Sequence, residues 1–413
     1  MNNDNSLKGS RRTFLQWSAM GAAAAAASAF HIVNEPMLAA AAVVNRERKK
    51  FPPGSTVINA NENPLGPCDA ARAAIVDMAP QGGRYSYWLT DELVDTFAQQ
   101  QGLKPEHIRP FPGSSEPLHF SVLAFTSPTR SYVAGDPGYE SGGHAAKISG
   151  ARIVNVPLTK TYAHDIPAML AAAPDAGLFY VCTPNNPTGT LTSHADIEQL
   201  VAKKPKDSIV LVDEAYIHFS DTGTALDLVK ADQDVIVLRT FSKIYGMAGI
   251  RCGFAIARPD LLAKLENCGG WSALPITAVA AATASLKHEH LVSDRKALNT
   301  AIRQKTFDWL AGQGYSFTPS QANFFMVDTK RPVKEVIAAM AAKNVYIGRV
   351  WPAWPTYARI TVGTQPEMDA FQSAFAAVMK NSTTVSFALP ANSVGSRRNH
   401  IYADGQMLPE ISS

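Results

Sequence analysis

The sequence predicts an α/β fold with a mostly parallel, buried sheet, followed by a smaller α+β domain. Between about residues 108 and 257, short β-branched or apolar runs alternate with helical segments, as they do in βαβ units. Several of these runs lack polar–apolar alternation, which is typical of strands covered on both faces. The 413 residues, 46% of them hydrophobic and 18% charged, suffice for one large and one smaller globular domain.

The individual elements follow from the same runs. We predict strands at Ser131–Ala134, Arg152–Val156, Leu178–Cys182, Ser208–Val212, Val235–Arg239 and Cys252–Ala257. Helices are predicted between them, including Glu116–Phe125, Tyr139–Ile148 and Ser193–Lys203. The smaller domain is expected to contain an alanine-rich helix from near Ala278, strands at Asn323–Val327 and Arg359–Val362, and a last helix at Met368–Met379.

Charge and residue spacing argue against nucleic acid and metal as partners. The formal net charge is only +3, and the basic residues are scattered, so no extended basic surface is predicted. The cysteines form no CxxC pair, and His288 and His290 stand two residues apart in a polar stretch, a spacing more typical of a solvated helix end than of a metal site. We therefore expect a small-molecule partner, no metal and no nucleic acid.

The first forty residues have the order of an export signal. Arg11-Arg12 is followed by Phe14-Leu15, by a weakly hydrophobic run from Trp17 to Phe30 and by an alanine-rich segment. This run is shorter than the ~20 apolar residues that a membrane-spanning helix needs. The paired arginines resemble the twin-arginine motif, which is read by the twin-arginine translocase and is not an anchor.

We accordingly predict a twin-arginine signal peptide over residues 1–42, cleaved near Ala39–Ala42. The mature protein would be periplasmic or secreted, without a stable membrane anchor. The alternative is a basic N-terminal arm followed by an ordinary alanine-rich helix.

The segment from Arg239 to Gly253 carries the strongest chemical signal. Lys243 follows a predicted strand, Thr240 and Ser242 precede it, and Arg251 stands eight positions after it. A lysine amine forms a Schiff base with an aldehyde such as pyridoxal phosphate once its surroundings lower its proton affinity. Hydroxyl and guanidinium donors nearby suit the phosphate of such a cofactor. A lysine in a surface loop is the alternative.

Asp213 directly follows the apolar run Ser208–Val212, where a carboxylate needs a partner. A pyridinium nitrogen is such a partner, because a carboxylate beside it keeps the ring protonated and able to accept electrons. The alternative role of Asp213 is to cap a helix.

Two loops complete the set of candidate segments. In Cys182–Gly189, two prolines and a glycine fix a turn that can aim one amide side chain. The segment Gly113–Pro117 enters a predicted helix, whose free backbone N–H groups suit a phosphate. An ordinary loop and simple helix capping are the alternatives.

Together and in this order, the four segments resemble the fold-type I pyridoxal-phosphate enzymes, and most closely the histidinol-phosphate aminotransferase family. The likeness covers roughly Val57 to Met379. It implies a mostly parallel seven-stranded sheet, pyridoxal 5′-phosphate as cofactor, and transfer of an amino group between an L-amino acid or similar amine and a 2-oxo acid. It also implies a homodimer in which Tyr85 reaches the active site of the neighbouring subunit.

With this resemblance we expect an N-terminal arm at residues 43–66, a large cofactor-binding domain at 67–285, a small domain at 286–380 and a poorly ordered or surface-bound tail at 381–413.

The resemblance also assigns roles to matching residues. Lys243 is implied as the Schiff-base lysine and Asp213 as the partner of the pyridine nitrogen. Tyr216 and Asn186 match residues that hydrogen-bond the ring hydroxyl, and Tyr139 matches the aromatic ring stacked on the cofactor. The phosphate cup is matched by Ser114, Ser115, Thr240, Ser242 and Arg251, with Ser115 at a position where the family commonly has aspartate. Lys243, Asp213 and Tyr216 are the expected catalytic residues.

Three further residues are expected to contact substrate. Arg359 matches the arginine that binds the substrate carboxylate, a task suited to a guanidinium. Asn63 lies in Asn59–Gly66, which resembles an arm folded over the substrate. Arg349 is a candidate for binding a phosphorylated substrate, but the segment Val350–Trp354 that follows is unusually aromatic. Its tryptophans fit either a core or a pocket narrowed toward apolar or aromatic side chains.

Other functions on this scaffold stay open at this point, because a fold does not fix a reaction. Decarboxylases, cyclases and oxidases that use the same cofactor share these motifs by resemblance. A non-catalytic cofactor- or ligand-binding protein is the alternative from another class. Regulators of that kind usually append a DNA-binding helix-turn-helix, whereas an export signal is expected here.

Overall fold

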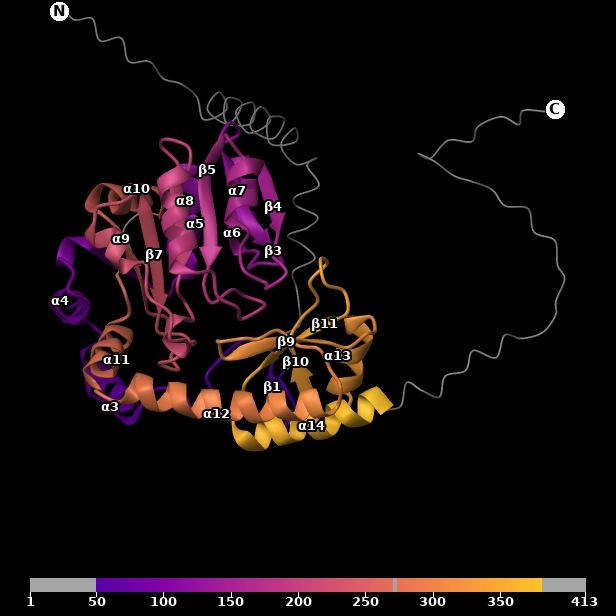
Figure 1. Cartoon of the computed structure of the whole chain (residues 1–413). Coiled ribbons are helices and arrows are strands. Elements are labelled where there is room, and N and C mark those ends of the chain that lie inside the picture. The colour runs from indigo at the N-terminus through magenta and orange to yellow at the C-terminus, as the bar shows by residue number, and fades with distance from the viewer. Residues whose placement is uncertain (1–49, 270–272, 381–413) are drawn as a thin grey trace, which may run out of the picture. The chain divides into compact units, whose positions relative to one another are not determined.

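The computed structural model describes residues 50–269 and 273–380 (Figure 1). The predicted signal peptide, its cleavage site and the predicted tail lie outside the described residues. Residues 50–53 carry no helix or strand, and the described residues from Gly54 onward belong to one compact unit. Within the two described ranges, no helix combines the length and apolar character that a bilayer crossing requires.

A seven-stranded mixed sheet organises the larger part of this unit, with the strand order β2-β8-β7-β6-β5-β3-β4. The strands are β2 (Ile108–Phe111), β3 (Ser131–Asp136), β4 (Ile153–Pro157), β5 (Ala176–Cys182), β6 (Ile209–Asp213), β7 (Val235–Thr240) and β8 (Gly253–Ile256). The strands from β7 to β4 pair in parallel, and β8 is antiparallel to both of its neighbours, β7 and β2. The expected mostly parallel seven-stranded sheet is therefore confirmed.

The six strands that we named from apolar runs agree with β3 to β8 within two residues at each end. Every residue of β5, β6, β7 and β8 is buried, which explains why these strands lack alternation. The seventh strand, β2, was not predicted as a strand. Its Arg109 and Pro110 are only partly buried and interrupt the apolar pattern.

Helices pack on this sheet or on one another beside it. They are α3 (Asp69–Met78), α4 (Trp88–Gln101), α5 (Ser115–Phe125), α6 (Ser141–Ser149), α7 (Ile166–Ala172), α8 (His194–Lys203), α9 (Leu226–Lys230), α10 (Pro259–Gly269) and α11 (Ile276–Lys287), with 3-10 turns η1 (Ala79–Gln81), η2 (Pro105–His107) and η3 (Ile217–Phe219). Helix α5 packs between α6 and α10, α7 packs against α8, and α11 packs against α3 and α4. The prediction that a helix begins at Tyr139 was wrong by two residues, which leaves Tyr139 in the loop before α6.

Two small sheets lie apart from the large one (Figure 1), and their strands contribute to a second hydrophobic core. Strands β9 (Phe324–Asp328) and β11 (Tyr357–Thr361) pair antiparallel, and β1 (Thr56–Ile58) pairs in parallel with β10 (Val345–Ile347). Helices α13 (Val333–Ala341) and α14 (Gln365–Lys380) pack with them. The sequence did not predict β1, a strand of three residues whose partner lies almost 300 residues further along the chain.

The long helix α12 (Leu291–Gly312) joins the two cores. Its Leu291 belongs to the core beside the large sheet, whereas Ile302, Phe307 and Leu310 belong to the second core. The domain boundaries that we expected, including the one at residues 285 and 286, stay a prediction.

Candidate active site

The candidate residues gather at one edge of the large sheet. Loops at the carboxyl ends of parallel neighbours meet at the same edge, and Asn186, Asp213 and Lys243 stand at the ends of β5, β6 and β7. Strand β8 runs the opposite way, so its beginning, just after Arg251, lies at this edge too. Gly253 there is opposite Phe111, the last residue of β2.

A cavity of about 410 Å³ opens at this edge. Its lining includes twelve of the predicted site residues: Ser114, Ser115, Tyr139, Asn186, Asp213, Tyr216, Thr240, Ser242, Lys243, Arg251, Arg349 and Arg359. The volume lies in the range usual for small-molecule sites. The structure therefore brings together side chains that are spread over almost 250 positions of the sequence.

The amine of Lys243 has an environment that weakens its hold on a proton. The residue is partly buried, and its Nζ lies 5.5 Å from the centre of the Tyr216 ring. Burial lowers the pKa of Lys243 to about 8, and the Arg359 charge acts in the same direction, whereas Glu62 and Asp213 oppose it. A large share of this amine is therefore neutral near pH 8, as a nucleophile or base must be.

Asp213 is held as a buried carboxylate at the end of β6. It is 4% exposed, its Oδ2 accepts a hydrogen bond from the Tyr180 hydroxyl at 2.9 Å, and its Oδ1 accepts one from the Ala215 N–H at 3.1 Å. Burial raises the pKa of Asp213, and these two hydrogen bonds and the Lys243 charge oppose that rise. Sequence analysis missed Tyr180, although a tyrosine in a wholly buried strand needs a partner for its hydroxyl.

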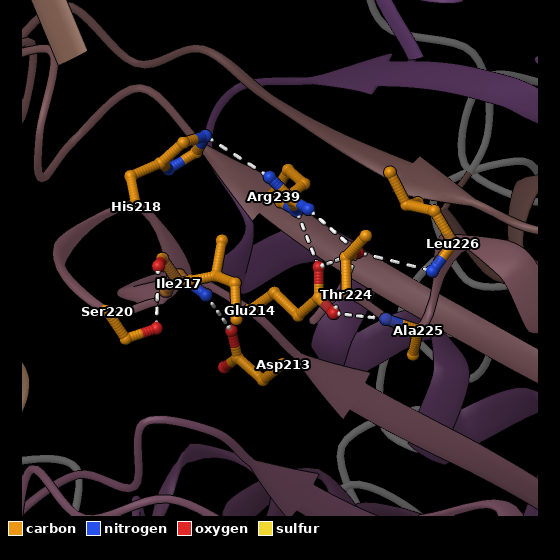
Figure 2. Close-up of polar contacts among 10 residues, drawn as sticks. Asp213, Glu214, Ile217, His218, Ser220, Thr224, Ala225, Leu226 and Arg239 are labelled. Carbon is orange, nitrogen blue, oxygen red and sulfur yellow. Dashed lines mark hydrogen bonds and ion pairs between the residues drawn. The ribbon is translucent and has the colours of Figure 1, made fainter. Parts of the chain in front are cut away.

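The residue after Asp213 does not line the cavity and instead makes polar contacts with the loop that follows (Figure 2). Glu214 is 1% exposed, and its carboxylate accepts hydrogen bonds from Arg239 Nε at 2.7 Å and from the Ala225 N–H at 2.7 Å. The hydroxyl of Thr224 donates to the same carboxylate and accepts from Arg239 Nη2 at 2.9 Å. This network ties the end of β6 to β7, and so holds Asp213 beside the loop of Lys243.

Hydroxyl and guanidinium donors cluster next to the start of α5. Arg251 Nη1 donates to the Ser242 hydroxyl at 3.1 Å, and the Thr240 hydroxyl also donates to Ser242, at 2.9 Å. Arg251 has a φ of 69°, in the left-handed region that non-glycine residues rarely adopt. Gly113 has a φ of +88°, and a Cβ there would lie 2.1 Å from Arg251 Nη2. The backbone conformation favours glycine here, and a side chain would also displace the Arg251 guanidinium.

Arg359 approaches the cavity from β11 and is 5% exposed. Its Nη1 donates to Asn186 Oδ1 and its Nη2 to the carbonyl of Asn59, both at 2.8 Å. Its buried Nε has no hydrogen-bond partner among the described residues. Burial lowers the pKa of Arg359 to about 10. The guanidinium is therefore fixed in position by two of its five N–H donors, and the second N–H of Nη1 and of Nη2 has no hydrogen bond among the described residues.

The N-terminal segment contributes a residue that the sequence did not single out. Asn61, with a φ of 55°, donates from its amide to the Tyr216 hydroxyl at 3.3 Å and from its backbone to the Thr361 hydroxyl at 2.9 Å. The predicted Asn63 instead donates to the carbonyl of Ile244 at 3.0 Å and is not among the residues that line the Lys243 cavity. The sequence did indicate the segment Asn59–Gly66, which contains Asn61, as an arm near the substrate, but it did not distinguish Asn61 within that segment.

The two tryptophans after Arg349 pack within the protein. Trp351 is 2% exposed, and its indole N–H donates to the carbonyl of Gly138 at 3.2 Å. The ring of Trp354 packs on Tyr357 with 4.8 Å between ring centres. Tyr85, expected at the neighbouring subunit's site, is 70% exposed and stacks on Tyr87, so it does not line the cavity of its own chain.

The residues present fit pyridoxal 5′-phosphate. The cavity offers one lysine amine with a lowered pKa and one buried carboxylate, the two groups that the aldehyde and the ring nitrogen require. The cluster of Ser114, Ser115, Thr240, Ser242 and Arg251 offers the donors that a phosphate requires.

Comparison with known proteins agrees with this assignment. Residues 55–375 match the family model of class I and II aminotransferases. The histidinol-phosphate aminotransferase of Moorella thermoacetica is 32% identical over 329 residues, which cover 77% of this chain and 84% of that protein. The aromatic amino acid aminotransferase of Cutibacterium acnes is 32% identical over 327 residues, which cover 78% of this chain and 92% of that protein.

The fold is shared with solved structures. The histidinol-phosphate aminotransferase of Sinorhizobium meliloti, solved in complex with pyridoxal-5′-phosphate, has a TM-score of 0.74 at 24% identity, covering 79% of this chain and 92% of that chain. The chain therefore belongs to the class I and II aminotransferases, and it is a pyridoxal-phosphate-dependent aminotransferase.

Proposed function

We propose that Lys243 is the Schiff-base lysine of this aminotransferase, which moves an amino group between an L-amino acid or similar amine and a 2-oxo acid. One observation carries the proposal: the amine of Lys243, with a pKa of about 8, shares its cavity with the buried carboxylate of Asp213. An amine that is partly neutral near neutral pH both binds an aldehyde and accepts a proton.

Bound pyridoxal 5′-phosphate supplies an electron-accepting ring that stabilises negative charge at the substrate's α-carbon. Asp213 would hold the proton on the ring nitrogen, and Tyr216 and Asn186 would hydrogen-bond the ring hydroxyl. Tyr139 would stack on the ring. The phosphate would bind the donors of Ser114, Ser115, Thr240, Ser242 and Arg251, which line the same cavity.

Lys243 and Arg359 would act on the substrate itself. The amine of Lys243 would take the proton from the substrate's α-carbon once that amine is free. Arg359, fixed by Asn186 and the carbonyl of Asn59, would bind the substrate carboxylate with its remaining N–H donors. Both groups are buried or partly buried, so water competes little with either contact.

Borohydride reduction of the holoenzyme, followed by peptide mass analysis, tests the role of Lys243. We expect the cofactor mass on the peptide that contains Lys243, and loss of both the adduct and turnover in Lys243→Ala. Lys330→Ala, which removes a lysine that pairs with Asp328 at the surface, serves as the control. An adduct on another lysine, or normal turnover by Lys243→Ala, would overturn the proposal.

We also propose a homodimer in which Tyr85 completes the neighbouring subunit's site. The exposed Tyr85, Tyr87 and Trp88 support it, since monomers seldom expose several adjacent aromatic side chains. Mixing inactive Tyr85→Ala and Lys243→Ala subunits should restore activity, because one site of each hybrid would then have both side chains. A hybrid that stays inactive, although dimers form, would contradict the shared site.

Export by the twin-arginine route is proposed from the sequence of residues 1–42, which lies outside the described residues. Residues 1–45 fused to a reporter should direct it out of the cytoplasm. Changing both Arg11 and Arg12 to Lys should abolish this export, and persistent export would refute the proposed signal.

A further inference from the structure

Three guanidinium groups line the Lys243 cavity, those of Arg251, Arg349 and Arg359. That of Arg349 is paired with a carboxylate. Its Nη2 contacts Oε2 of Glu140, a residue 209 positions away that directly follows Tyr139. Glu140 stands at the N-cap of α6, but its side chain makes no capping hydrogen bond. The carboxylate of Glu140 therefore pairs with Arg349 and does not cap its own helix.

Trp351 fixes the relative position of these groups. Its ring centre lies 4.9 Å from Cζ of Arg349 and 5.0 Å from Cζ of Arg359, distances at which a guanidinium is attracted to an aromatic ring. The indole N–H donates to the carbonyl of Gly138, two residues before Glu140. One buried side chain thus contacts both arginines and the loop that carries Glu140.

The two arginines differ in charge balance. Among the described residues, Arg359 forms no salt bridge, whereas Arg349 is paired with Glu140. The Arg349 and Glu140 side chains are 51% and 41% exposed, so a ligand can approach both. A carboxylate ligand consequently finds a guanidinium without a salt-bridge partner at Arg359 and a paired one at Arg349.

We propose that Glu140 makes this enzyme select amino donors with neutral side chains over donors whose side chains carry a phosphate or carboxylate. This inference rests on the proposed function, in which Arg359 binds the substrate's α-carboxylate. An anionic side chain that reaches Arg349 must lie beside the Glu140 carboxylate or displace it, and like charges repel. A neutral side chain leaves the Arg349–Glu140 pair intact.

The size of the effect follows from the exposure of the pair. One charge pair near the surface changes binding by up to about fivefold, and a phosphate carries about two charges. Glu140→Gln should therefore raise kcat/KM for a phosphorylated donor by up to about thirtyfold relative to a neutral donor. For a carboxylate side chain, the relative gain should be about fivefold at most.

The experiment compares holoenzymes of wild type, Glu140→Gln and Glu335→Gln. Glu335 faces Arg331 at 4.0 Å on α13, outside the cavity, and serves as the matched control. Donors are L-phenylalanine, L-glutamate and O-phospho-L-serine, each followed by spectral conversion of the cofactor. A second readout needs no turnover: calorimetry gives the Kd of 3-phenylpropanoate and of 3-phosphonopropanoate, which lack an amino group.

In Glu140→Gln we expect kcat/KM to rise most for phosphoserine, less for glutamate and not at all for phenylalanine. We also expect the Kd of 3-phosphonopropanoate to fall, and that of 3-phenylpropanoate to stay unchanged. Equal gains for all donors, or none, would overturn the selection proposed for Glu140. The double variant Arg349→Gln/Glu140→Gln should not show this rise in kcat/KM for the anionic donors. A rise that persists in the double variant would also overturn the inference. If no donor converts the cofactor in any variant, the proposed function fails, while the calorimetry still decides the role of Glu140.

Discussion

Replacing Asp213 with Asn should affect cofactor binding and folding in opposite ways. The Asp213 carboxylate favours binding of the cofactor, whereas its burial lowers the stability of the folded apoprotein. The Asp213 side chain is 4% exposed, and burial raises its pKa. Asn keeps the shape of the side chain and removes the charge. Its amide can still satisfy Tyr180, since a tyrosine hydroxyl accepts as well as donates a hydrogen bond. The Ala215 N–H keeps an oxygen acceptor.

The cofactor should bind more weakly to this variant. A hydrogen bond to a charged group contributes about 1.5–3 kcal/mol, so we expect the Kd of the cofactor to rise by about 10- to 150-fold. Pyridoxamine 5′-phosphate is the suitable probe, because it lacks the aldehyde and cannot bond to Lys243. Turnover should fall further than binding, since the carboxylate also keeps the ring nitrogen protonated.

The apoprotein should not lose stability. A raised folded-state pKa means that Asp213 contributes stability below its unfolded value of about 3.9, and that this contribution is lost as the pH rises through the folded value. Asn does not titrate. The unfolding free energy of the Asn variant, relative to that of the Asp213 protein, should therefore increase across that pH window and stay constant above it. Urea unfolding of the two apoproteins at neutral pH measures the difference.

The control is Asp232→Asn, which removes an exposed carboxylate that faces His107 and should leave the Kd of the cofactor unchanged. An unchanged Kd in Asp213→Asn, or an apoprotein destabilised by more than about 2 kcal/mol, would refute the reasoning.

Three further predictions follow from the same contacts. Because the pKa of Lys243 is lowered to about 8, folded apoprotein binds fewer protons than the unfolded chain between about pH 8 and 10.5. Its unfolding free energy should therefore rise over that window by up to about 3 kcal/mol, and urea titrations of Lys243→Met should lack the rise. Arg359→Lys replaces a planar guanidinium with a point charge and should lower kcat/KM for amino acids by about 10- to 150-fold. The loss should be much smaller for amines without a carboxylate. Equal losses for both kinds of donor would contradict a contact between Arg359 and the substrate carboxylate. Arg239→Met leaves the buried Glu214 carboxylate without its cation and should cost about 3–5 kcal/mol of stability, whereas Arg239→Met/Glu214→Leu should recover part of that loss in thermal or urea unfolding.

The sequence alone predicted the large sheet and most of the site because both depend on short segments. Apolar runs with polar ends located strands β3 to β8, and the residues at those ends, Asp213, Asn186 and Lys243, carried the chemistry. Parallel order then required these loops to meet at one edge. The segments proposed to bind the phosphate were recognisable for the same reason, since turn and helix-entry residues act within a few positions of one another.

Only the tertiary structure decided which distant groups pair. The strand β1 is too short to have a periodic signal, and it exists because β10 lies beside it. The contacts of Asn61 with Tyr216, Tyr180 with Asp213 and Arg349 with Glu140 join segments that have no local relationship. A polar side chain in the sequence shows that it needs a partner, but the partner is chosen by packing, because burial makes an unpaired group costly and brings remote residues within reach.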